Sequence, residues 1–300
     1  MIWGVHLKKI FIIFLIIGLL FITNTVESFE ENSYSIIYIS PVGDGNFTKI
    51  QDGIDAAEPG DIVYVYNGTY FENIVIDKTI TLVGEDKQST VIDGRSVGNT
   101  IKVNADNVTI KNFTITHSGL IYPLSGINLS SNYNTIEDNI ITDNFYGITL
   151  YFSSGNTIIG NTIQNDDHCG IYISSSKNNF FINNLIRNNN FNGIGLYYSS
   201  DNNTIKNNNF VDNRFCAVNI RISSNNNVVG NNFSDNNIGI YIPNYSNTES
   251  NNSFSDNGIN VEREFVFSEN LPILLFVFAV IIFIFVIISY IIFRKKKKIN

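Results

Sequence analysis

The sequence has few of the side chains that bind soft metals. Its 300 residues include two Cys, one Met and three His, and the Met is the first residue. Copper sites are built from His, Met or Cys. After the first apolar segment only His117, His168, Cys169 and Cys216 remain. The sequence therefore predicts no dedicated copper site and no bound cofactor, and it predicts two free thiols.

Basic residues are also scarce between the two ends of the chain. All 27 Asp and Glu lie between Glu27 and Glu269, and that region holds 12 of the 19 Lys and Arg, because seven lie outside it. Its formal charge is therefore about −15 (12 minus 27), compared with −8 for the whole chain. An acidic surface opposes binding to the phosphates of nucleic acids. We expect no nucleic-acid partner.

Helix-forming stretches are nearly absent outside the apolar ends. The exception is 50–57, where Ile50, Ile54 and Ala57 form one apolar stripe that could cover an open end of a repeat domain. Elsewhere Ile, Val, Phe, Tyr and Thr alternate with Gly, Asn, Asp and Ser, which is the chemistry of strands and turns. This composition argues against helical repeats, and leucine-rich repeats are disfavoured because the apolar residue is mostly Ile.

One short phrase returns every 19 to 24 residues between 126 and 261: GINL at 126, GITL at 147, GIYI at 170, GIGL at 193, AVNI at 217, GIYI at 239 and GINV at 258. A second phrase, N-x-apolar-x-x-N-x-apolar, lies between its copies, as in NTIEDNII from 134 and NTIIGNTI from 156. Repeats of this length indicate a stacked architecture. Each short strand must pair with its equivalent one repeat away, at about 4.8 Å. The pattern predicts an all-β fold, a single-stranded parallel β-helix or solenoid.

Strand alternation predicts which side chains point inward. The first phrase gives Ile148 and Leu150, Ile171 and Ile173, Ile194 and Leu196, Val218 and Ile220, and Ile240 and Ile242; the second gives Ile136, Ile141, Ile158, Ile163, Phe181, Ile186, Ile205, Phe210, Val228 and Phe233. In the same register one asparagine recurs. We predict that its copies form an internal ladder, since buried amides must be hydrogen-bonded: Asn139, Asn161, Asn184, Asn208, Asn231 and Asn252.

Both ends of the chain have the character of membrane segments. Lys8 and Lys9 precede an apolar run from Ile10 to Ile22, as in a secretory signal or an N-terminal anchor. Leu271 to Phe293 is long enough to cross a bilayer, and the basic tail after it stays in the cytoplasm. The expected protein is a single-pass cell-surface protein with its β-helix outside. Its parts are 1–28 (signal peptide or anchor), 35–115 (cap and first coils), 116–262 (regular repeats), 263–270 (juxtamembrane linker), 271–293 (transmembrane helix) and 294–300 (cytoplasmic tail).

The runs NFTKIQDGIDAAEPGD, VYVYNGTYFENIVI, ITLVGED and VIDG resemble the N-terminus of pectin-lyase-like right-handed β-helix proteins. The later coils are similar to NosD-like copper-associated and archaeal cell-surface members. The resemblance covers about 36–261 and implies a right-handed solenoid. It does not define an activity, because the fold hosts lyases, hydrolases, esterases, epimerases and non-catalytic proteins. It also implies one further alternative, an accessory role in metal-cofactor maturation.

Polysaccharide hydrolases of these families use N-T-D, D-D, G-H-G and R-I-K in order. This chain has Asp166 with Asp167 and Arg221 with Ile222, but neither N-T-D nor G-H-G. Asp143 and Asp166 each lie four residues before a strand glycine, so they are expected in adjacent coils, where two carboxylates could share a proton or hold calcium. The alternative is that they are ordinary turn residues, in a column that continues as Asn189, Asn213 and Asp235.

The outward face of the GI strands is the candidate ligand surface. Thr149, Tyr172, Gly195, Asn219 and Tyr241 form one predicted exposed column, and Tyr151, Ser174, Tyr197, Arg221 and Pro243 form the next. Sugar rings pack on aromatic rings while their hydroxyls bond to Asn and Arg. We predict a polysaccharide-binding or structural module using Tyr151, Tyr172, Tyr197, Asn219, Arg221 and Tyr241. The alternatives are a lyase or hydrolase acting on acidic or neutral glycans, and tyrosines that only stabilise neighbouring strands.

Nine N-x-(S/T) sequons would suit a glycosylated surface protein. Their asparagines are Asn46, Asn67, Asn107, Asn112, Asn128, Asn202, Asn232, Asn244 and Asn251.

Overall fold

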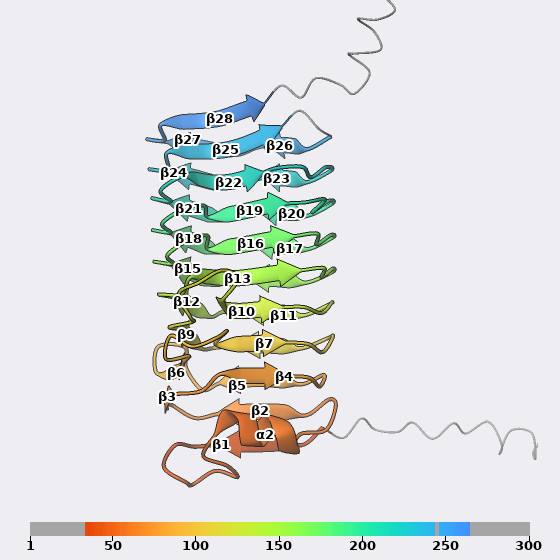
Figure 1. Ribbon diagram of the computed structural model, residues 1–300, viewed down its shortest axis with the longest axis vertical. Coiled ribbons are helices and arrows are strands. Elements are labelled where there is room, and N and C mark those ends of the chain that lie inside the picture. Colours follow the sequence, from red (N-terminus) through yellow and green to blue (C-terminus); the bar gives the residue numbers. More distant parts are fainter. Residues whose placement is uncertain (1–33, 244–245, 265–300) are drawn as a thin grey trace, which may run out of the picture. The chain divides into compact units, whose positions relative to one another are not determined.

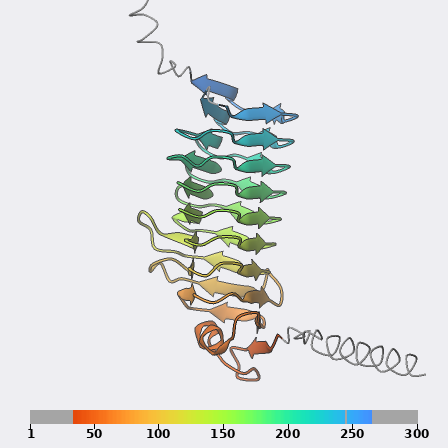
Figure 2. The same cartoon turned by 90° about the vertical axis from the view of Figure 1, so that its right-hand side faces the viewer.

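Residues 34–243 and 246–264 are described by the computed structural model. From Ile36 onward, strands from successive turns of the chain stack in parallel and build three sheets (Figures 1 and 2). The predicted all-β parallel β-helix of the right-handed type is confirmed, as is its short N-terminal helix. The first 28 residues and the predicted transmembrane segment 271–293 lie outside the described residues. Within the described part of the chain, no helix has the length and apolar character of a membrane span.

The strands of each sheet follow one another in space in the same order as in the chain. Sheet A contains β1 (Ile36–Ile39), β2 (Ile62–Val65), β5 (Thr81–Gly84), β8 (Thr109–Lys111), β11 (Thr135–Glu137), β14 (Thr157–Ile159), β17 (Phe180–Ile182), β20 (Thr204–Lys206), β23 (Asn227–Val229) and β26 (Thr248–Ser250). Sheet B contains β3 (Gly68–Tyr70), β6 (Thr90–Asp93), β9 (Thr114–Thr116), β12 (Ile140–Thr142), β15 (Thr162–Gln164), β18 (Leu185–Arg187), β21 (Asn209–Val211), β24 (Asn232–Ser234) and β27 (Ser253–Ser255). Sheet C contains β4 (Ile74–Ile76), β7 (Ile101–Val103), β10 (Ser125–Leu129), β13 (Tyr146–Tyr151), β16 (Ile171–Ser174), β19 (Ile194–Tyr197), β22 (Cys216–Ile220), β25 (Ile238–Pro243) and β28 (Ile259–Glu264).

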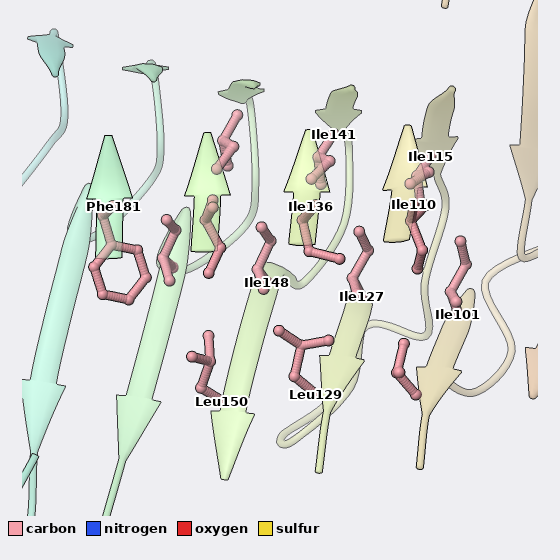
Figure 3. Packing of buried hydrophobic residues seen from close by; sticks show 14 of the residues in the cluster. Ile101, Ile110, Ile115, Ile127, Leu129, Ile136, Ile141, Ile148, Leu150 and Phe181 are labelled. Atoms are coloured by element: carbon pink, nitrogen blue, oxygen red, sulfur yellow. The ribbon is translucent and has the colours of Figure 1, made fainter. Parts of the chain in front are cut away.

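The core consists of vertical files of apolar side chains. Ile148 pairs with Ile171, and Ile171 pairs with Ile194, so these three residues lie in one file as predicted. Figure 3 shows how such files from the three sheets converge on the axis. Every residue predicted to point inward has a relative exposure of 0 or 1%. The strands are short, and the sequence closes one continuous core because equivalent side chains repeat in every coil.

The predicted asparagine ladder is present. From Asn161 onward each member accepts a hydrogen bond from the backbone N–H of the member before it, whereas Asn139 accepts from the N–H of Phe113. The amide of each member donates to a backbone carbonyl of the preceding coil: Asn139, Asn161, Asn184, Asn208, Asn231 and Asn252. This ladder stands at the corner between sheets A and B. Two further ladders, which were not predicted from the sequence, stand at the other corners. One contains Asn134, Asn156, Asn179, Asn203, Asn226 and Asn247, and the other contains Asn144, Asp166, Asn189, Asn213, Asn236 and Asn257.

The helix α2 (Ile50–Ala56) covers the N-terminal end of the solenoid, as predicted. Ile50, Ile54 and Ala57 are all fully buried. Side chains of the next coil satisfy both helix ends, which short helices need because their terminal backbone groups lack intrahelical partners. Glu72 accepts bonds from the N–H groups of residues 50 and 51 at 2.9 and 3.0 Å. The Nζ of Lys78 donates to the carbonyls of residues 55 and 57 at 2.7 and 2.9 Å.

Two inward positions of the last described coil carry opposite charges. Glu249 pairs with Val228 in sheet A, and Arg263 pairs with Ile242 in sheet C, so both side chains stand where the preceding coil has buried apolar ones. Nη2 of Arg263 lies 2.9 Å from Oε1 of Glu249. Charges at inward positions of an edge oppose pairing with another chain. The ion pair therefore protects the C-terminal edge of the solenoid.

Replacing both charges, Glu249→Val and Arg263→Val, is expected to make the chain self-associate. The substitutions turn the charged edge of the last described coil into an apolar one, and an apolar edge strand is a template for pairing with another chain. Light scattering coupled to size-exclusion chromatography should show a molar mass that rises with concentration in the double variant relative to the unchanged chain. Identical masses for both proteins over the same concentration range would contradict this role of the ion pair.

Candidate functional site

The outward face of sheet C carries a group of stacked tyrosines. Tyr172 lies between Thr149 and Gly195, and Ser174 lies between Tyr151 and Tyr197, which is the predicted register. The rings of Tyr172 and Tyr197 are stacked, with centroids 5.1 Å apart and an interplanar angle of 26°. Tyr151 lies 5.8 Å from Tyr172 on the other side. We call Tyr122, Tyr146, Tyr151, Tyr172 and Tyr197 the tyrosine cluster.

Two members of the tyrosine cluster were not predicted from the sequence. Tyr146 is the first residue of β13, is only 3% exposed, and lies 5.1 Å from Tyr172. Tyr122 comes from the loop between β9 and β10, and its ring meets those of Tyr146 and Tyr172 edge-on at 6.3 and 6.4 Å. The sequence signal for Tyr122 was the irregular stretch 117–124, which interrupts the repeat. This loop brings its tyrosine over the two following coils.

The predicted exposure of the outer columns is wrong at four positions. Thr149 is fully buried, Asn219 is 2% exposed, and Gly195 and Pro243 are also buried. Thr149 Oγ1 bonds to Ser125 and to the amide of Asn128, both at 2.9 Å. Near Asn219, the Tyr197 ring folds over Gly195, where it occupies the space of a side chain: a Cβ there would lie 2.5 Å from the ring. The columns therefore form a packed surface rather than a row of free side chains.

Two buried polar atoms on this face have no hydrogen-bond partner among the described residues. They are the hydroxyl of Tyr151 and Oδ1 of Asn219. Buried polar atoms are normally bonded, so an exception indicates a missing water, ion or ligand group. Burial also raises the pKa of Tyr146, Tyr151, Tyr172 and Tyr197 far above the usual value. These phenols stay neutral at physiological pH and can both donate and accept hydrogen bonds.

Arg221 follows β22 and borders the tyrosine cluster. Its guanidinium carbon lies 5.1 Å from the ring centroid of Tyr241, in the geometry of a cation–π contact. Arg221 also favours the ionised form of Tyr197, although burial dominates the shift of that pKa. Arg221 and Tyr241 thus lie together, next to Asn219 in the strand register.

The candidate acids lie elsewhere, at the corner between sheets B and C. Asp166 and Asp167 precede β16, whereas Arg221 follows β22, so the predicted catalytic residues are divided between opposite ends of the sheet C strands. The expected stacking of Asp143 on Asp166 is wrong by one residue, because the N–H of Asn144 donates to Asp166 Oδ1 at 3.0 Å. The corner has two residues between Asn144 and Gly147 but three between Asp166 and Gly170. Counting back from the glycines therefore misaligned the two coils.

A polar groove of about 730 Å³ runs along this corner over several coils. Asn and Asp side chains line it, together with Arg214, whose guanidinium donates to Asn190 Oδ1 at 2.8 Å. Asp235 lines the groove as well, but the ladder member in its coil is Asn236 and not Asp235 as the predicted column had it. The groove is open and follows the ladder, so we interpret it as the outer side of the stacked corners.

The sequons differ in their accessibility. Asn128 is 7% exposed and its amide donates to Thr149, so this sequon on sheet C is closed to modification in the folded chain. Asn202 and Asn251 are exposed, at corners beside sheet A.

The stacked sheets and the fully packed interior define a pectin-lyase-like parallel β-helix. The chain belongs to the NosD family, described as periplasmic copper-binding protein (NosD), which matches residues 54–266. A cell surface glycoprotein of Methanothermus fervidus is 40% identical over 72 residues, which is 23% of this chain and 12% of that protein.

Solved structures share the fold at low identity. The catalytic domain of a GH87 α-1,3-glucanase in complex with tetrasaccharides has a TM-score of 0.60 at 18% identity, covering 77% of this chain and 45% of that one. The same domain with nigerose has a TM-score of 0.59 at 17% identity, covering 77% and 44%. The chain thus spans less than half of these glucanase domains.

The copper in the family's description does not fit the residues that the structure describes. Within 34–243 and 246–264, no three His, Cys, Asp or Glu side chains come together in a way that could hold a metal ion. Cys169 and Cys216 are both free and buried, and Asn192 lies between them, bonded to both residues. Burial raises the pKa of each thiol to about 12, so in the metal-free chain both are protonated at neutral pH.

Proposed function

We propose that this protein is a non-catalytic glycan-binding module of the cell surface, and that the tyrosine cluster on sheet C is its binding face. The observation that carries the proposal is the pair of unpartnered buried atoms, the Tyr151 hydroxyl and Asn219 Oδ1, on either side of the stacked Tyr172 and Tyr197. A hydroxyl-rich ligand can donate to one and accept from the other. The rings supply the apolar contact that sugar faces require.

The charges on this face favour a neutral glycan. The outward positions from β10 to β25 include Asn128, Thr149, Tyr172, Asn219 and Tyr241, with Arg221 as the charged residue of that stretch and already stacked on Tyr241. A uronate polymer would meet the net negative charge of the domain, which raises the cost of bringing a polyanion to the surface. The glucanase that shares the fold was solved with nigerose and with tetrasaccharides. We therefore expect a neutral hexose polymer.

The arrangement of the acids supports binding over hydrolysis. Glycosidases hold two carboxyl groups on either side of one bond, about 5 to 9.5 Å apart. In this chain Asp166 is 1% exposed and belongs to a ladder, while Arg221 lies at the other end of the sheet C strands. Display at the surface belongs to the same proposal and is supported by the related glycoprotein. The membrane anchor at 271–293 is also part of this proposal, and it is supported by the apolar sequence of that segment.

Replacing Tyr151 with Phe is expected to weaken glycan binding without destabilising the chain. In the free protein the hydroxyl lies beside the Tyr122 side chain but makes no hydrogen bond of good geometry, so the variant should lose little stability. A bound sugar would lose one hydrogen bond, worth about 0.5 to 1.5 kcal/mol or roughly twofold to tenfold in Kd. Affinity should be measured by calorimetry on neutral and uronate oligosaccharides, with thermal unfolding beside it. Phe180→Ala, an exposed aromatic of sheet A in the adjoining stretch of chain, is the matched control and should leave affinity unchanged.

Three results would overturn the proposal. One is the absence of retention on every glycan of the panel. Another is equal affinity of the Tyr151→Phe variant and the unchanged chain. The third is the appearance of new reducing or unsaturated ends that Asp166→Asn abolishes, which would establish a hydrolase or lyase instead.

A further inference from the structure

Asp166 is the acid in the ladder at the corner between sheets B and C. The other members are Asn144, Asn189, Asn213, Asn236 and Asn257. It occupies its position as they do: its Oδ1 accepts from the N–H of Asn144 at 3.0 Å, and its own N–H donates to Oδ1 of Asn189 at 3.2 Å. The carboxyl group has replaced an amide in a place that is 1% exposed.

A ladder position requires a donor as well as an acceptor. Asn161, in the adjacent corner of the same coil, shows the full pattern: its Nδ2 donates to Ile136 O at 2.8 Å and to Asn184 Oδ1 at 3.1 Å. Further along Asp166's own ladder, Nδ2 of Asn213 donates to Ile186 O at 3.1 Å and to Asn236 Oδ1 at 2.9 Å. An ionised carboxylate has no hydrogen to donate. At this position an ionised carboxylate would leave the acceptors of the ladder without a hydrogen bond.

The second oxygen of Asp166 is the one that lacks a partner: Oδ2 is buried and has no hydrogen bond among the described residues. It faces the backbone of Gly147, where a Cβ would lie only 2.5 Å from it. Residues 34–243 and 246–264 place no cation in an ion pair with Asp166. The titratable groups that interact with it are Asp143 in the preceding coil and Asp167 and Cys169 in its own coil. His168 lies between these last two in sequence, and Arg214 lines the same groove two coils further along.

We propose that Asp166 stands in the folded protein as a neutral carboxylic acid whose Oδ2–H replaces the amide N–H of the ladder, which makes this coil a pH-sensitive joint beneath the tyrosine cluster. The proton supplies the missing donor, and no charge is buried. In support, burial is the largest influence on the pKa of Asp166 and raises it well above 3.8, although hydrogen bonds from the backbone and side chain of Asn144 lower it. The charges of Asp143 and Asp167 raise it further.

The joint connects to two strands of the tyrosine cluster. Asp166 leads through the corner into β16, which carries Tyr172. Its Oδ2 occupies the space where a side chain of Gly147 would lie, in β13, which carries Tyr146 and Tyr151. Ionisation of Asp166 would therefore loosen the point from which these strands start. That consequence for ligand binding rests on the proposed function, whereas the consequence for stability does not.

The sign of the pH dependence follows from linkage. The folded pKa lies above the unfolded one, so the unfolded chain releases the proton first as pH rises from about 4. The stabilisation is complete below the unfolded pKa and is lost as pH rises through the folded pKa. Each pH unit within that interval lowers the folding equilibrium constant by about tenfold for one such group. The contribution of Asp166 should accordingly favour the folded chain most in mild acid.

The test compares unfolding of the full chain and its Asp166→Asn variant by denaturant between pH 4 and pH 9. The variant restores the amide of the ladder and is expected to fold. It should show a shallower loss of stability with pH, with the difference between the two proteins growing by up to about tenfold in the equilibrium constant per pH unit. A second variant, Asn161→Asp with Asp166→Asn, moves the acid to the adjacent ladder and should restore the dependence.

The comparison isolates Asp166 from His168, whose pKa is lowered by burial and which remains in every variant. Parallel curves for the unchanged chain and Asp166→Asn would overturn the proposal. So would stability that rises with pH in the unchanged chain and not in the variant, because this would show a favourable carboxylate. Glycan affinity measured on the same proteins separates the two hypotheses: a pH effect on stability without any glycan binding retains this inference and rejects the proposed function.

Discussion

Replacing Asn184 with Leu is expected to lower the free energy of unfolding by about 2 to 6 kcal/mol, because two buried backbone groups lose their partners at about 1 to 3 kcal/mol each. Oδ1 of Asn184 accepts from the N–H of Asn161 at 2.9 Å, and its Nδ2 donates to Ile158 O at 2.9 Å. The side chain is 1% exposed, so water cannot replace these bonds. Denaturant unfolding followed by circular dichroism measures the loss.

The neighbouring position supplies a control within the same turn. Asn183 is exposed, has a φ of +55°, and makes no side-chain hydrogen bond in the described part of the chain. Glycine adopts that φ without a steric penalty, so Asn183→Gly should change stability by less than about 1 kcal/mol. Equal losses for the two substitutions would show that the ladder amide contributes nothing beyond the turn itself.

Much of the fold could be predicted because the repeat contains two independent signals, the alternation of apolar residues along each strand and the recurrence of asparagine at each turn. Alternation along each strand gave the inward side chains, and the recurring second Asn of the longer phrase gave one ladder. The first Asn of that phrase, as in Asn156 and Asn179, forms a ladder too, but a single turn asparagine looks the same in sequence whether its amide is stacked or solvated. The third ladder was predicted only as a column of turn residues, and counting back from the glycines put Asp143 and Asp235 in the places of Asn144 and Asn236.

The outer face could be predicted only in part. Strand pairing fixes which residues share a column, so the register of Tyr172 and Tyr197 followed from the repeat. The exposure of a residue in such a column depends on how the neighbouring aromatic rings are oriented. The Tyr197 ring folds over Gly195 because glycine has no side chain to occupy that space. Tyr122 comes from a loop outside the repeat, whose path no periodicity constrains. Sites built from insertions lie beyond what a repeat pattern can predict.

A series of Phe→Ala substitutions is expected to give a graded loss of stability along one file of the core. The rings of Phe210 and Phe233 stack at 5.0 Å, and those of Phe233 and Phe254 at 5.1 Å. Phe210 and Phe233 are 0 and 1% exposed, so each truncation should cost about 3 to 5 kcal/mol. Phe254 is only partly buried in the last described coil, and we expect a loss of about half that or less.

The gradient follows from the one-dimensional character of a solenoid, in which each coil contacts only its neighbours. A terminal coil can open without unfolding the rest, so Phe254→Ala should also raise hydrogen exchange in β26 and β27 while leaving β16 protected. Phe210→Ala should instead weaken protection on both sides of its coil. Equal losses at all three positions, with uniform exchange, would mean that the coils unfold as one unit and that the charged edge at Glu249 and Arg263 holds the last coil as firmly as the interior ones.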